Sequence, residues 1–362
     1  MRRTILFFAL TFLSITLVSG SGISTEQPDQ SDGIDEVEHA IQEAITSRRE
    51  TTLALILSEM KVENVGVSQD GNWGVGWLIP AELQTGEFAP IEPGLAITVK
   101  EQGKWRVLLP NDAGWIDALQ DTPDDLLSHE IKDVWIKMNT PLEVAIPNTA
   151  LSGYLLPWEA GVTRNLTQST CHDEYTSSGN SHYAFDFSTY GVLWNIYASK
   201  AAKVWLWKDD VPTCYASTCS DTQALGNYIV LKDETTSPIS YQLYLHLAQG
   251  SIPDNLKIQG KSVSQGQFIG IVDNTGQSWG HHLHFQVQVP LYGDNYYWGR
   301  SIDITFDDVD INGGRPRVIN SYCNDLEYCD WEGDVCEEFR GPYTSQNEIT
   351  IIRENFFPLI LR

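Results

Sequence analysis

The fold of this chain is decided by the stretch Gly280-His281-His282-Leu283-His284-Phe285-Gln286-Val287. After a glycine-rich turn, β-branched or aromatic residues alternate with others, and this pattern predicts a β-strand. Side chains on a strand alternate between its two faces, so His282 and His284 share one face and His281 points away from them. Two imidazoles on one face are suited to a zinc site or to acid–base chemistry. Other parts of the chain must supply the remaining groups of such a site.

Two more predicted strands offer polar groups of the right kind. On the first, His182 and Asp186 are four residues apart, so they are expected to point to the same side. With His284 they would supply two imidazoles and one carboxylate, and three such ligands plus a water make the open, catalytic kind of zinc site. On the second strand, Ser240–Leu247, alternate leucines face the core, and His246 is expected on the opposite face with Tyr244.

Taken together, these strands resemble the lysostaphin-type zinc endopeptidases. The family pattern is H-x-x-x-D, then H-L after an aromatic-rich strand, then H-x-H followed by Phe. The sequence matches it at His182/Asp186, at His246-Leu247 and at His282-Leu283-His284-Phe285. Between these pieces, residues 262–270 resemble the family's V-x-x-G-Q-x-I-G strand and turn, and residues 274–280 resemble its loop before H-x-H. The resemblance covers roughly residues 151–290, and it is the joint pattern that is specific.

The resemblance implies that His182, Asp186 and His284 bind one zinc ion per chain. It also implies that His246 and His282 handle protons and steady the oxyanion beside the metal. Zinc lowers the pKa of a bound water towards ~7, and an imidazole can accept the proton of that water and pass it to the leaving amine. The expected function is therefore a secreted zinc metalloendopeptidase that hydrolyses peptide bonds, with peptidoglycan crosslinks as the substrate that the family implies.

Two other functions stay open. A non-catalytic cell-envelope protein of the same fold would bind a partner and regulate other wall enzymes, although all five family positions are present here. A secreted peptidase acting on soluble, glycine-rich peptides would apply the same chemistry to another substrate. A serine hydrolase is disfavoured, because Gly276-Gln277-Ser278-Trp279-Gly280 fits G-x-S-x-G but is followed by a strand, whereas that motif leads into a helix.

The start of the chain and its charge favour a place outside the cell. Residues 1–22 read as a secretory signal peptide, with Arg2 and Arg3, a short apolar run and small residues at the exit. The run is shorter than the roughly 20 residues of a membrane span, so we expect no stable span after signal removal. The formal net charge of −25 becomes about −27 without the two arginines, which argues against nucleic acid as a partner.

The expected organisation is a small α+β domain followed by a mainly antiparallel all-β catalytic domain, for which the resemblance implies a lysostaphin-type, duplicated-hybrid-motif-like fold. The expected segments are a linker at 23–33, the α+β domain at 34–139, a linker at 140–150, the catalytic domain at 151–322 and a Cys-bearing extension at 323–362. Because the α+β domain precedes the catalytic domain and carries no catalytic constellation, we expect it to cover the substrate groove or to target the wall.

Several local elements are also expected. A helix is predicted over 34–49, hairpins are predicted around Asp70-Gly71 and Gln102-Gly103, and a second helix is predicted to start at Thr122. Six cysteines in an exported chain favour disulfides. Cys214 and Cys219 are close enough to close a local loop in the insertion at 208–225, and the other pairings stay open.

Overall fold

The computed structural model describes residues 30–49, 55, 58–82, 85–169, 172, 180–291, 296–317 and 341–349. The expected signal peptide and much of the C-terminal extension lie outside these residues, as do Cys171, Cys323, Cys329 and Cys336. Within the described ranges, no helix is both long enough and apolar enough to cross a membrane.

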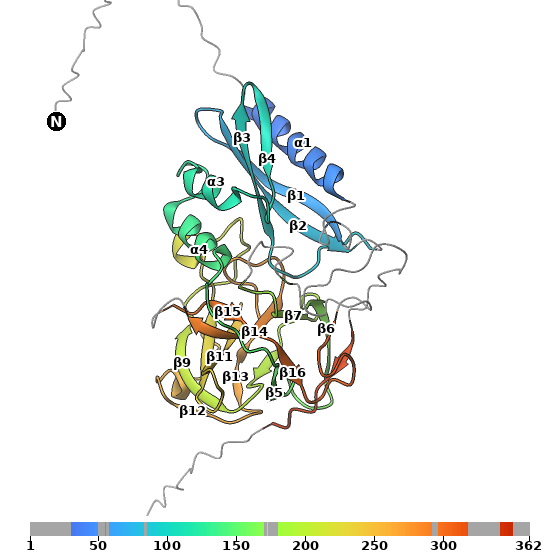
Figure 1. The fold of residues 1–362 in the computed structure, drawn as a ribbon, viewed down its shortest axis with the longest axis vertical. Coiled ribbons are helices and arrows are strands. Elements are labelled where there is room, and N and C mark those ends of the chain that lie inside the picture. The colour runs from blue at the N-terminus through green and yellow to red at the C-terminus, as the bar shows by residue number, and fades with distance from the viewer. Residues whose placement is uncertain are drawn as a thin grey trace, which may run out of the picture.

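The N-terminal part of the chain is a four-stranded antiparallel sheet with helices on both faces (Figure 1). Its strands, in spatial order, are β1 (Ser58–Val67), β2 (Trp73–Glu82), β3 (Gly94–Glu101) and β4 (Lys104–Leu108). Helix α1 (Gln30–Arg48) packs on the face that carries Leu78 and Ala96. Helices α3 (Trp115–Asp121) and α4 (His129–Asn139) cover the face that carries Trp77 and Ile97, because neighbouring strand residues point to opposite sides.

Both predicted hairpins are confirmed. β1 pairs with β2 and β3 pairs with β4, and the second turn has Gln102 at φ 50° and Gly103 at φ 79°, the two positive torsions of a type I′ turn. The boundaries of the helices differ from the prediction. α1 begins at Gln30, inside the expected linker. Its first turn is polar, so the apolar periodicity that predicted the helix does not extend to it. Thr122 ends α3 instead of starting a helix, and Ser128 caps α4 by accepting a hydrogen bond from the N–H of Ile131.

The C-terminal part is built on a nine-stranded antiparallel sheet with the order β12-β9-β10-β11-β14-β7-β6-β17, and β15 pairs with β14. The strands are β6 (Thr163–Gln168), β7 (Phe185–Ser188), β9 (Ala202–Lys208), β10 (Tyr228–Asp233), β11 (Ser240–Leu245), β12 (Ser262–Val263), β14 (His282–Leu291), β15 (Gly299–Ser301) and β17 (Tyr343–Thr344). Two small two-stranded sheets complete the C-terminal part. β8 (Asn195–Tyr197) pairs with β13 (Phe268–Ile271), and β5 (Leu151–Tyr154) runs parallel to β16 (Ile304–Phe306).

Both faces of the large sheet are covered in its middle. One face packs into an aromatic core that includes Phe185, Phe187 and Phe285. On the other face, Leu243 and Leu245 of β11 belong to a cluster that also contains residues of α4. Helix α4 therefore touches both sheets, and the N-terminal part lies directly over one side of the C-terminal part (Figure 1).

Candidate metal centre

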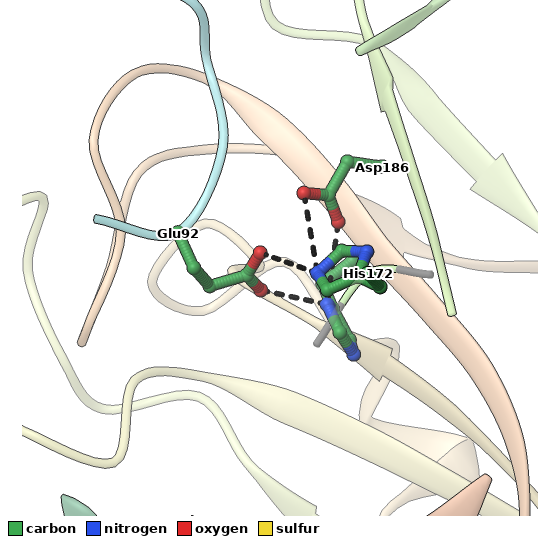
Figure 2. A group of neighbouring side chains, drawn as sticks. Glu92, His172 and Asp186 are labelled. Atoms are coloured by element: carbon green, nitrogen blue, oxygen red, sulfur yellow. Dashed lines mark hydrogen bonds and ion pairs between the residues drawn. The ribbon is translucent and has the colours of Figure 1, made fainter. Parts of the chain in front are cut away.

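The centre of the candidate site lies between two neighbouring strands. Asp186 of β7 is paired directly with His284 of β14, and residues paired in this way point to the same side of a sheet. Asp186 Oδ1 lies 3.2 Å from His284 Nδ1, and Asp186 Oδ2 lies 3.6 Å from His172 Nε2. Glu92, which comes from the N-terminal part, completes the group (Figure 2). Its Oε1 lies 2.6 Å from His284 Nδ1, and its Oε2 lies 3.0 Å from His172 Nε2.

The structure brings Asp186 and His284 together as predicted, but it does not bring His182 to them. The expectation that His182 and Asp186 share a face of one strand is wrong, because β7 begins only at Phe185. His182 lies in a turn that is closed by the hydrogen bond from the N–H of Ala184 to the carbonyl of Ser181. It belongs to neither of the clusters of metal-type ligands found among the described residues, and His172 supplies the second imidazole.

Sequence reasoning missed His172 and Glu92 for different reasons. His172 precedes the matched motif and lies on no predicted strand. Glu92 belongs to another part of the chain, 80 positions before His172. The available signal for Glu92 was weak: it is a carboxylate inside the otherwise apolar, proline-containing segment Ala89–Pro93.

The donor atoms fit a divalent metal such as zinc. Ligand atoms of Glu92, His172, Asp186 and His284 all lie within 4.8 Å of one another and are buried. Tetrahedral ligands at about 2.0–2.1 Å from zinc are about 3.3 Å apart, and the contacts here range from 2.6 to 3.6 Å. The two oxygens of Asp186 and Nδ1 of His284 have no hydrogen-bond partner among the described residues. Since buried polar atoms normally have partners, this set suits a cation that two carboxylates neutralise.

Burial and mutual contact shift the pKa values of these groups strongly. Burial by itself raises the pKa of the Glu92 carboxyl, but the imidazoles of His284 and His172 outweigh it and hold that pKa well below its usual range. Burial, together with the neighbouring Glu92 carboxylate, raises the pKa of Asp186. Burial lowers the pKa of His284, yet the carboxylates of Glu92 and Asp186 outweigh it and raise this pKa to about 10. Such a site favours a positive charge at its centre.

His246 and His282 stand beside the metal ligands with defined orientations. His246 Nδ1 lies 2.7 Å from the carbonyl of Thr275, and His282 Nδ1 lies 3.0 Å from the carbonyl of Gly280. A carbonyl only accepts, so both Nδ1 atoms carry the hydrogen, and each Nε2 faces the site. These Nε2 atoms lie 3.1 Å and 3.7 Å from the Glu92 carboxylate. Burial lowers the pKa of His246 to about 4, so this ring is neutral near neutral pH.

The backbone explains how His246 reaches the site. β11 ends at Leu245, and His246 has φ 64°, in the left-handed region that L-residues rarely adopt. The alternation of a regular strand therefore stops before His246. The expectation that Tyr244 shares its face is wrong, because Tyr244 is buried in the aromatic core.

A chain of glutamines fixes the orientation of His284. His284 Nε2 donates to Gln286 Oε1 at 3.1 Å, and Gln286 Nε2 donates to Gln288 Oε1 at 2.5 Å. This hydrogen bond places the proton on Nε2 and leaves the lone pair of Nδ1 directed at the metal position. His281 points away from the group, as its position in the strand predicts, and its Nε2 lies 3.0 Å from Asp273 Oδ1.

Comparison with known proteins identifies the C-terminal part. Residues 181–297 match the model of Peptidase family M23, a family that includes the lysostaphin-type zinc endopeptidases. This chain therefore carries an M23 peptidase domain, and the resemblance drawn from its histidine motifs is confirmed. No curated protein matches the chain.

The solved structures that are similar include the following two. The catalytic domain of lysostaphin from Staphylococcus simulans is 20% identical, with a TM-score of 0.22, and the match covers 39% of this chain and 81% of that domain. A zinc-containing peptidase from Vibrio cholerae is 15% identical, with a TM-score of 0.25, and the match covers 77% of this chain and 98% of the other. TM-scores this low carry no argument, so the assignment of the C-terminal part rests on the match to the family model.

Proposed function

We propose that this protein is a secreted zinc metalloendopeptidase and that His172, Asp186 and His284 hold its metal. The observation that carries the proposal is the convergence of the Asp186 carboxylate and two imidazoles in one buried group. Beside it, Nε2 of His246 lies 3.1 Å from Glu92, and Nε2 of His282 lies 3.8 Å from Asp186. The M23 family of residues 181–297 supports the reaction class. Secretion rests on the signal-peptide pattern at residues 1–22.

The residues around the metal have separate tasks in peptide hydrolysis. A zinc ion, when bound, polarises the scissile carbonyl and acidifies a water molecule. The neutral His246 accepts a proton at Nε2 and delivers it to the leaving amine, since its Nδ1 is held by Thr275. In its imidazolium form, with Nδ1–H held by the carbonyl of Gly280, His282 donates from Nε2 to the developing oxyanion. Gln286 keeps His284 in its ligating orientation.

The choice between His172 and His182 decides the ligand set. The geometry of the described residues favours His172, while the H-x-x-x-D pattern favours His182. We expect His172→Ala to lose the zinc, because only Asp186 and His284 then remain of the three proposed ligands. His182→Ala should keep close to one zinc per chain. Metal content after gel filtration, measured by mass spectrometry, distinguishes the two ligand sets. A His182→Ala protein without metal, together with a His172→Ala protein that keeps its metal, would overturn our assignment.

The proposed substrate is the peptide crosslink of peptidoglycan, which the family suggests. The alternatives are soluble, glycine-rich peptides, or a regulatory role without catalysis. Purified wall and a glycine-rich peptide should be incubated side by side with the protein, and the products read by mass spectrometry. New amino termini from the wall alone support the proposal. Cleavage of the soluble peptide alone favours the first alternative. Metal-loaded protein that cleaves neither, also when Glu92 is replaced by alanine, favours the second.

A further inference from the structure

His246 and His282 form a second group of candidate metal ligands together with Glu92. Ligand atoms of these three side chains lie within 4.8 Å of one another, and all three side chains are buried. Nε2 of His246 lies 3.1 Å from Glu92 Oε1, and Nε2 of His282 lies 3.7 Å from Glu92 Oε2. The two imidazole rings are neighbours, with centroids 4.6 Å apart. This group shares only Glu92 with the group around Asp186.

Both imidazoles present a lone pair to the same place. Their Nδ1 atoms are held by carbonyl oxygens, that of Thr275 for His246 and that of Gly280 for His282. In the neutral ring the hydrogen is therefore on Nδ1, and the lone pair of Nε2 is available to a metal ion. Histidine ligands usually donate their other ring N–H to a carbonyl or carboxylate, which fixes the ring and makes the ligating nitrogen more basic. Both histidines have this arrangement.

His282 gives an independent indication of a ligand. Its side chain is fully buried, and its Nε2 has no hydrogen-bond partner among the described residues. Buried polar atoms normally have partners. The carboxylate of Glu92 faces this nitrogen from 3.7 Å, which is too long for a hydrogen bond. Two ligands of one tetrahedral zinc ion are also farther apart than most hydrogen bonds, at about 3.3 Å. A cation between them would give His282 the partner that it lacks.

We propose that His246, His282 and Glu92 form a second site for a divalent cation such as zinc, and that Glu92 bridges the ions of the two sites. Imidazole ligands suit zinc, nickel and copper better than magnesium or calcium, which prefer oxygen. The ions of two-metal sites lie about 3.5–4 Å apart. A bridge of this size fits Glu92, whose Oε1 lies 3.1 Å from His246 Nε2 and 2.6 Å from His284 Nδ1.

Charge makes the second site the weaker of the two. The carboxylates of Glu92 and Asp186 together neutralise one divalent ion. A second ion adds two positive charges in the same buried place, and the ligands that come with it, His246 and His282, are neutral when they bind metal. Net charge that is buried without a counter-charge costs free energy. We therefore expect the second site to fill only when zinc exceeds the amount that the first site takes up.

A cation in the second site should stop peptide hydrolysis. This consequence, unlike the binding itself, rests on the proposed function of the two histidines. An imidazole whose Nε2 binds a metal has no lone pair left there, so His246 can no longer accept a proton. For the same reason His282 can carry no hydrogen on Nε2 and cannot donate to the oxyanion. Excess zinc should therefore inhibit cleavage, and removal of the excess should restore it.

Binding is tested by counting zinc ions at limiting and at excess zinc. The protein is dialysed to equilibrium at each zinc concentration, and its metal content is measured by mass spectrometry. We expect the unaltered protein to take up a second zinc ion per chain in excess zinc, whereas His246→Ala and His282→Ala keep only the first. His281→Ala is the matched control and should also take up the second ion, since His281 pairs with Asp273 and points away from the site.

Cobalt shows whether the two ions share one carboxylate, and this measurement needs no variant. Two paramagnetic ions that a carboxylate bridges couple magnetically, so the electron paramagnetic resonance signal of the fully loaded protein should be smaller than the sum of two separate ions. Glu92→Gln should lose the second cobalt ion, because an uncharged amide is a weaker ligand. Signals that simply add would place the second ion away from Glu92 and would overturn the proposal.

The outcomes separate this inference from the proposed function. A protein that never takes up a second ion has no second site, and the first site is unaffected by that result. A second ion that both His246→Ala and His282→Ala retain is held elsewhere, which also overturns the inference. If the second ion binds as expected but cleavage continues at the same rate, the second site stands and the proton-transfer roles of the two histidines are wrong.

Discussion

At the scale of the residue, His246 owes its place in the site to one backbone torsion. A left-handed φ of 64° in a residue with a Cβ costs about 1–2 kcal/mol, and such strain is retained where the surrounding structure holds it. The carbonyl of Thr275 holds it here, by accepting from Nδ1 at 2.7 Å. The same contact leaves Nε2 as the only basic nitrogen of the ring, which suits a residue that accepts and returns a proton.

We therefore predict that His246→Ala keeps its zinc and loses turnover. The ligands Asp186 and His284 are unchanged, whereas general acid–base assistance contributes about 10²–10⁴-fold to rate. The measurement is kcat together with metal content, made also in the Glu92→Ala background, which lacks the carboxylate that contacts Nε2 of His246. His281→Ala is the matched control, because His281 is the neighbouring imidazole that pairs with Asp273 outside the site. A near-native kcat for His246→Ala would disprove its assigned role.

At the scale of the element, α4 joins the two parts of the molecule. Val134 and Met138 on its buried side pack against Tyr228 and Leu243 of the large sheet. Trp135, one position on from Val134, packs with the N-terminal sheet and donates from Nε1 to Gln277 Oε1 at 3.1 Å. Helical spacing thus lets one short helix present two apolar sides to two different sheets.

The cap of this helix gives a stability prediction. Ser128 Oγ accepts from the N–H of Ile131 at 3.3 Å and donates to Asp221 Oδ1 at 2.6 Å. Ser128→Ala should lower the free energy of unfolding by about 1 kcal/mol, the usual value of a serine cap. Urea denaturation measures it, with Ser47→Ala as the control, since Ser47 is exposed within α1. Equal stability of the two variants would mean that the cap contributes nothing.

At the scale of the whole molecule, the candidate metal ligands come from both parts. Glu92 comes from the N-terminal part and His172, Asp186 and His284 come from the C-terminal part. A ligand that binds only the docked arrangement stabilises that arrangement by mass action. A bound zinc ion is therefore expected to hold the segment around Glu92 against the C-terminal part, in addition to its chemical role.

Removal of the metal should consequently loosen the contact of Ile91 with Trp279. We predict that chelation speeds hydrogen exchange at the amides of Ile91 and Trp279, which bond to each other, while amides of β3 inside the N-terminal sheet stay protected. In Glu92→Ala, exchange at Ile91 and Trp279 should be fast with or without zinc. If chelation leaves both amides of the wild-type protein unchanged, Glu92 is not a ligand of the metal.

The sequence by itself determined the features that depend on local periodicity or short spacing. The alternation around His282 and His284 gives β14 and the face that both histidines share, the glycine turns give two hairpins, and the spacing of Cys214 and Cys219 gives their loop. These features follow from neighbours along the chain, whose geometry is fixed by a strand, a turn or a short closed loop.

Only the tertiary structure decided the composition of the metal site. It places His172, and not His182, in the group of candidate ligands, because a turn ends the alternation before β7. It also brings in Glu92, which lies 154 positions from His246. The left-handed backbone torsion of His246 also turns its own side chain toward the site. No periodicity relates positions so far apart, so their meeting depends on how the two sheets pack against each other through α4 and the loop of residues 214–219.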